Sequence, residues 1–429
     1  MTKKNLVILV AVMVVLGGLY FLARPRTTQH ESQDQVTLLS GIDGEKVAKV
    51  SVEQGEGKLE LELKDGTWTI PSRAGYAAEG SKVRSLFLKL LDLSTSQSVP
   101  AGTAGLKKLG LDDKGVKNGR ALVKFFDKDG HELGGVYLGE TRKGEKSDEQ
   151  GPRMTISGQY VRSTKNDRVF LVGLPVNITT AISEWLDTNL MNVLQSKVYE
   201  VVQTKIAPDG AKAKVFELVP ESEDGRKEGT PLAFKPAAPV PVDFDLQKPV
   251  ISQISSGLEN VRFSDVRHAD DAEVKDLVFD SETEYQSMDG LVYTVLTSQK
   301  GDKIHAKVRV HFDADLVKNL QELYAKRKED RDKEKEKEKQ AHPTPAPGET
   351  PTREEVDEPA EKSEQPKFSN ADEASKIQAR FEPWIYELAN YQGQKFRKSA
   401  DDLMQKKPPP ADAQATAAPM TTPAPMSIP

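Results

Sequence analysis

The chain of 429 residues contains no cysteine, so neither a disulfide nor a thiolate-bound metal can stabilise it. Aromatic residues make up only 6% of the chain and there are 6 histidines, which leaves few side chains for stacking or metal binding. Basic residues are interleaved with acids and the formal net charge is −6, so the basic face that nucleic-acid binding requires is missing. The missing cysteine therefore excludes a disulfide scaffold, and the mixed charge argues against nucleic-acid binding.

The chain also lacks the short motifs of several enzyme classes. It has no phosphate loop of the G-x-x-x-x-G-K-[ST] kind, no G-x-G-x-x-G fingerprint and no G-x-S-x-G nucleophile elbow. Asp313 and Asp315 begin like a calcium loop, but Lys318 and Tyr324 stand where an EF-hand needs glycine and glutamate. Asp313 is therefore predicted to cap a helix. We predict no catalytic, cofactor-binding or metal-binding residue, and a protein that is not an enzyme.

The remaining polar candidates also favour structural roles. His305 and His311 lie on one face of a predicted strand, but without a third ligand both are predicted to face solvent. Two pairs of adjacent acids stand beside predicted loops and are expected to cap or turn the chain: Asp112 with Asp113, and Asp270 with Asp271. The tryptophans have apolar neighbours and are expected to anchor cores: Trp68, Trp185 and Trp384.

One long apolar run stands out in this hydrophilic chain. Residues 6–23 carry no charge and are flanked by Lys3, Lys4, Arg24 and Arg26. As a helix with a rise of about 1.5 Å per residue they span about 27 Å, close to the hydrocarbon core of about 30 Å. Because no small-x-small cleavage site follows, we favour an uncleaved anchor, and a cleaved signal peptide is the alternative.

Two basic residues lie on each side of the apolar run, so the positive-inside rule barely distinguishes the two orientations of this helix in the membrane. Residues 1–5 are expected to stay in the cytoplasm, which places the bulk of the chain in the periplasm beyond an inner (cytoplasmic) membrane. Residues 24–45 are polar and without a sustained period, and they are predicted to be a linker.

Residues 46–195 are predicted to form a first α+β lobe. Alternating apolar residues and Asp-Gly or Gly-containing turns indicate antiparallel hairpins. Apolar spacing of three and four indicates helices. The expected strands are 47–52, 59–63, 68–70, 121–126, 136–138, 160–162 and 169–172, and the expected helices are 82–93 and 179–191.

The same order of elements recurs in a second lobe that an insertion interrupts. Residues 196–324 give hairpins 199–204 with 214–219 and 291–297 with 303–312, and a helix at 250–258. Residues 376–407 supply the closing strand, 381–388, and the closing helix, 393–404. Charged and Pro/Glu-rich residues 325–375 and the tail 408–429 are predicted to be disordered. The predicted class is thus a membrane helix followed by two similar lobes of antiparallel sheet with packed helices.

Several short motifs, in their order, resemble the bacterial domain-of-unknown-function family 4340. They are residues 64–70, the helix that follows, residues 110–112, residues 138–140 and residues 160–162. The resemblance covers residues 47–191 well and the second lobe more loosely, with residues 384–404 matching the closing strand and helix. It implies a membrane-tethered envelope protein, in some members encoded beside auxiliary subunits of gliding-motility-type ABC transporters. It implies no catalytic residues.

Two functions from different classes remain at this point. The first, which we favour, is a non-enzymatic scaffold or accessory module that binds a protein partner in a membrane complex, such as an ABC-type transport or motility system. The alternative is a periplasmic enzyme or ligand-binding protein that acts on cell-wall material in a cleft between the lobes. The sequence predicts no cofactor and no nucleic-acid partner, and it identifies no small-molecule ligand.

Overall fold

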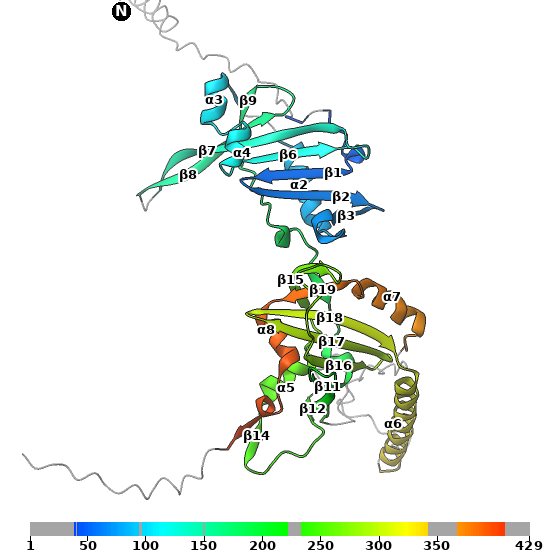
Figure 1. Ribbon diagram of the computed structural model, residues 1–429. Coiled ribbons are helices and arrows are strands. Elements are labelled where there is room, and N and C mark those ends of the chain that lie inside the picture. Colours follow the sequence, from blue (N-terminus) through cyan, green and yellow to red (C-terminus); the bar gives the residue numbers. More distant parts are fainter. Residues whose placement is uncertain are drawn as a thin grey trace, which may run out of the picture. The chain divides into compact units, whose positions relative to one another are not determined.

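The computed structural model describes residues 38–39, 41–93, 97–148, 151–221, 233–341 and 367–407. They form two compact units (Figure 1). The first holds the described residues up to Pro71 and Ala77–Trp185, and the second holds Ser72–Tyr76 and the described residues from Leu186 onward. Each unit is built on a 9-stranded sheet. The predicted α+β class with two lobes of antiparallel sheet is confirmed in its coarse form, a mixed fold with two large antiparallel sheets, and the helices are few.

The first sheet has the order β4-β3-β2-β1-β6-β7-β8-β9-β5. Its strands are β1 (Lys49–Gln54), β2 (Gly57–Lys64), β3 (Thr67–Ile70), β4 (Tyr76–Ala77), β5 (Gln97–Val99), β6 (Ala121–Phe126), β7 (Glu132–Asp148), β8 (Gly151–Ser163) and β9 (Val169–Val172). The predicted turn at Asp65 and Gly66 is confirmed, with positive φ at both residues (48° and 79°).

Helix α2 (Gly80–Leu91) supplies the main helical layer of this unit (Figure 1). Its apolar stripe buries Val83, Leu86 and Leu90, as the spacing predicts. Two short helices, α3 (Thr103–Lys108) and α4 (Asp113–Lys117), follow, and 3-10 turns lie at Gly44–Lys46 and Ile182–Glu184. A third 3-10 turn, Pro71–Arg73, lies where the chain passes from the first unit to the Ser72–Tyr76 segment of the second. The hydrophobic core of the first unit therefore lies between α2 and one face of the sheet.

The second sheet has the order β10-β15-β19-β18-β17-β16-β11-β12-β13. Its strands are β10 (Asn189–Met191), β11 (Val198–Ile206), β12 (Lys212–Pro220), β13 (Phe234–Pro236), β15 (Val261–His268), β16 (Ser281–Ser287), β17 (Leu291–Lys300), β18 (Lys303–Phe312) and β19 (Trp384–Leu388), while β14 (Phe244–Leu246) pairs separately with β20 (Met404–Lys406). Its helices are α5 (Lys248–Ser255), α6 (Ala314–Ala341), α7 (Ala371–Phe381) and α8 (Asn390–Gly393), with 3-10 turns at Gln195–Lys197, Gln394–Arg397 and Asp401–Leu403.

Strand order is shared between the two sheets. The run β3-β2-β1-β6-β7-β8-β9-β5 of the first unit corresponds to β13-β12-β11-β16-β17-β18-β19-β15 of the second. A helix precedes the last strand of each run, α2 before β5 and α5 before β15. The closing strand β19 pairs with β18, as β9 pairs with β8, although α6 and α7 intervene in the chain.

Two predicted helices are wrong. Residues 179–191 form a 3-10 turn and strand β10 instead, because Trp185 is buried and its Nε1–H donates to the Thr179 carbonyl at 2.9 Å. Residues 393–404 form short turns and the start of β20. There the bidentate pair of Arg397 with Asp280, at 2.7 and 2.8 Å, fixes the backbone, and Lys398 is extended. In both segments, contacts with residues distant in the sequence decide the structure, although the spacing of apolar residues favours a helix.

The predicted disorder of residues 325–375 is also wrong in part. Helix α6 continues to Ala341 and α7 begins at Ala371. Leu316 and Leu320 bury the first turns of α6 against Val292, and the Lys333–Glu329 pair at 2.8 Å supports the exposed part. The closing strand also begins later than predicted, at Trp384, because Phe381 ends α7. Residues 342–366 and the tail 408–429 lie outside the described residues.

Within the described ranges, no helix is both long enough and apolar enough to cross a bilayer. The apolar run 6–23, with its flanking residues 1–5 and 24–37, lies outside those ranges.

Candidate functional site

A cleft of 310 Å³ lies on the second unit beside the neighbouring strands β15, β19 and β18. Three of its lining residues are buried: Val274, His305 and Ile385, with exposed fractions of 3%, 8% and 4%. The other six are charged and carry both signs: Asp265, Arg267, Glu273, Lys300, Lys303 and Glu387. The cleft thus combines a small apolar surface with a dense set of charges.

Sheet register places these side chains together. Glu387 in β19 lies opposite both Asp265 in β15 and His305 in β18. Directly paired residues in an antiparallel sheet project from the same face, so the three side chains form a row across three strands. At the end of the β17–β18 hairpin, Lys300 lies directly opposite Lys303. Residues more than eighty positions apart in the sequence therefore share one cleft.

Ion pairs hold most of the charges in place. Lys303 contacts Glu387 at 2.7 Å, which raises the pKa of the lysine. Arg267 contacts Glu273 at 3.0 Å and Asp271 at 3.4 Å. Across the described part of the chain, no ion pair involves Lys300. The acids of the cleft are thus at least partly neutralised, while one lysine is left to attract an anion.

Asp265 is held by a segment distant in sequence. Arg73 donates to both of its carboxylate oxygens, from Nε at 2.7 Å and Nη2 at 2.8 Å. Tyr76, in the same segment, meets Trp384 edge-on with ring centroids 4.9 Å apart, and burial raises its pKa to about 12. The Ser72–Tyr76 segment is therefore a structural part of the second unit that fixes one wall residue of the cleft.

The prediction that both strand histidines face solvent is wrong for His305. Its exposed fraction is 8%, and this burial lowers its pKa, so the imidazole is neutral at pH 7. His311 is exposed, as predicted. Among the described residues, no hydroxyl or carboxylate is hydrogen-bonded to His305.

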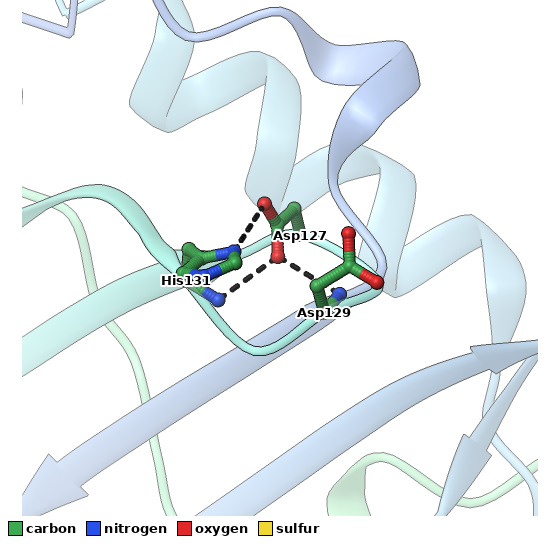
Figure 2. A group of neighbouring side chains, drawn as sticks. All are labelled: Asp127, Asp129 and His131. Carbon is green, nitrogen blue, oxygen red and sulfur yellow. Dashed lines mark hydrogen bonds and ion pairs between the residues drawn. The ribbon is translucent and has the colours of Figure 1, made fainter.

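A second cluster, in the first unit, brings together Asp127, Asp129 and His131 in the β6–β7 turn (Figure 2). One oxygen of Asp127 accepts hydrogen bonds from the backbone N–H groups of Asp129 and His131, both at 2.9 Å. Its other oxygen lies 3.2 Å from His131 Nδ1, and the bond from the His131 backbone lowers the pKa of Asp127. These are the contacts of a hairpin turn closed by an aspartate side chain, which is a structural role.

The other acids behave as predicted. Asp313 Oδ1 accepts from the N–H groups of Asp315 and Leu316, both at 2.9 Å, and so caps α6. Asp112 caps α4 by accepting from Gly115 N–H at 2.8 Å. Asp271 accepts from Glu273 N–H at 2.9 Å and turns the chain beside the cleft. Of the tryptophans, Trp185 is buried, while Trp68 and Trp384 are half-buried and lie against other aromatic rings.

A two-stranded arm, made of β7 and β8, protrudes from the sheet of the first unit (Figure 1). Strand β7 pairs with β6 only up to Leu138, and β8 pairs with β9 only from Gln159 onward. Between these points, residues 141–148 of β7 and 151–159 of β8 pair with each other, so the ribbon extends beyond the sheet. At its base, buried Gln159 donates to the Gly139 carbonyl at 3.2 Å and accepts from Val176 N–H at 2.9 Å.

By fold and by site, the chain is a two-unit protein of antiparallel sheets with a polar cleft and a protruding arm. Residues 68–281 match the family described as "Domain of unknown function (DUF4340)", and the chain is a member of that family over this stretch. The match runs from β3 into the first residue of β16, so it takes in parts of both units. None of the curated proteins and none of the solved structures compared with the chain matches it.

Proposed function

We propose that this protein is a membrane-anchored, non-enzymatic envelope protein that binds a protein partner in a membrane complex, such as an ABC-type transport or motility system. Residues 6–23 would hold it in the inner membrane with both units on the periplasmic side. We further propose that the two units are tandem duplicates, which their shared strand order supports. Confinement at the membrane raises the effective concentration of the units toward a membrane partner.

The arm is the observation that carries this proposal. Strands at both ends of the two large sheets are only 2 or 3 residues long, which protects the sheets from pairing with other chains. In the part of the chain that the structure describes, the outer part of the arm is a ribbon of β7 and β8 alone, and a two-stranded ribbon is marginally stable in water. A partner that added a strand to the arm, or packed on it, would stabilise this ribbon.

Ile156 provides an apolar contact point on this arm. It lies in β8 with an exposed fraction of 56%, within the part that pairs only with β7. Leu174 is a matched control, because it belongs to the same unit, lies outside the arm and has an exposed fraction of 82%. If the partner binds through the arm, binding should depend on Ile156 and not on Leu174.

Photocrosslinking in intact cells tests this function. A crosslinker at position 156 is expected to capture a membrane-complex subunit, whereas one at position 174 is expected to capture none. Arg142 lies directly opposite Gly158, so Asn-Gly in place of residues 143–157 closes a two-residue hairpin without changing the register. This replacement should abolish that capture while leaving the melting temperature of the protein within a few degrees. Equal capture at both positions, or undiminished complex assembly without the arm, would contradict the proposal.

A further inference from the structure

Four of the six charged residues that line the cleft form two pairs of like charge, and the other two, Arg267 and Glu273, form an ion pair with each other at 3.0 Å. Lys300 and Lys303 are directly opposite each other at the hairpin end, and Asp265 and Glu387 are directly opposite each other on the neighbouring strands. Like charges in such positions destabilise a sheet. Arg73 pairs with Asp265 and Lys303 pairs with Glu387, so both acids are partly neutralised, whereas within the described residues Lys300 has no ion pair. Each pair would be stabilised by an added charge of the opposite sign.

The space between the pairs is small and partly apolar. Its volume of 310 Å³ is at the lower end of the range for small-molecule sites, about 300 to 1,000 Å³. Ile385 and Val274 supply a buried apolar surface, and the neutral imidazole of His305 lies beside them without adding charge. A purely anionic ligand would add no positive charge beside the two acids, and a purely cationic ligand would add no negative charge beside the two lysines.

We propose that this cleft binds a small zwitterion, with its carboxylate at Lys300 and Lys303 and its ammonium at Asp265 and Glu387. Free α-amino acids and dipeptides both carry one carboxylate and one ammonium group. In either ligand, a short apolar side chain would contact Ile385. The site lies wholly within the second unit and is independent of the proposed scaffold function. Binding there requires no reaction.

Titration calorimetry on the purified full-length chain in detergent tests the proposal. The probes are alanine, dialanine, alanine amide and N-acetylalanine. Alanine or dialanine is expected to bind, and the amide and the acetylated compound should bind about tenfold or more weakly, because each lacks one of the two charges. Tighter binding of dialanine identifies a peptide ligand, and binding of alanine equal to or tighter than that of dialanine identifies a free amino acid.

Two variants locate the site. Lys300→Ala should weaken binding of the zwitterion about tenfold but leave binding of alanine amide unchanged. Lys307→Ala is the matched control, because Lys307 lies on the same face of β18 but does not line the cleft. An unchanged melting temperature shows that each variant is folded. The proposal is overturned if neither alanine nor dialanine binds at millimolar concentrations, if the amide binds as well as the acid, or if both variants have the same effect.

Discussion

Phe396→Ala is expected to destabilise the second unit by about 3 to 5 kcal/mol, the usual cost of truncating a buried phenylalanine. Its side chain has an exposed fraction of 1% and lies edge-on to the Tyr285 ring, with centroids 6.2 Å apart. Its carbonyl accepts hydrogen bonds from the hydroxyls of Ser281 and Thr283, both at 3.1 Å. Loss of the ring therefore creates a cavity beside a buried polar network that depends on this backbone position.

Urea unfolding measures this effect as a lower midpoint for the second unit. The control is Tyr391→Ala, because Tyr391 is aromatic, lies five positions earlier and has an exposed fraction of 71%. The control should change stability by less than about 0.5 kcal/mol. If Phe396→Ala and Tyr391→Ala lowered the free energy of unfolding by similar amounts, this closing segment would not pack as described.

Charge introduced into the apolar run should release the protein from membranes. An aspartate at the centre of a membrane helix costs about 2.5 to 3.5 kcal/mol on insertion scales, so Val14→Asp combined with Val15→Asp costs about twice that. After an alkaline carbonate wash, we expect the unaltered chain in the membrane pellet and the double variant in the supernatant. Val14→Leu with Val15→Leu preserves hydrophobicity and should stay in the pellet. Recovery of the unaltered chain in the supernatant would contradict the anchor.

Elements whose shape is decided by neighbouring residues agree with the prediction from sequence. The turn at Asp65 and Gly66 and the turn at Gly301, with a φ of 62°, require left-handed conformations that aspartate and glycine tolerate, so the hairpins could be predicted. The three-residue strands β5 and β10 could not be predicted, because their pairing partners are distant in the sequence. Helix 179–191 had convincing spacing, but burial of Trp185 decided its shape.

The cleft was missed for the same reason. Alternation marks Lys303 and His305 as one face of a strand, and Ile385 and Glu387 as one face of another. Only the observed register brings Asp265 opposite Glu387, across 122 positions of sequence. Burial of His305 follows from that assembly and from neighbours such as Val274, which lies in no predicted element. A sequence pattern cannot supply such register without knowing which strands are neighbours.

The orientation of the chain in the membrane tests the account most directly. Alkaline phosphatase, which is active only outside the cytoplasm, and green fluorescent protein, which is fluorescent when it folds inside, can each be fused after Lys407, the last described residue. The account predicts an active phosphatase fusion, a dark fluorescent fusion, and both proteins in the membrane fraction. A bright fluorescent fusion with an inactive phosphatase would place the two units inside the cell and contradict the proposed function.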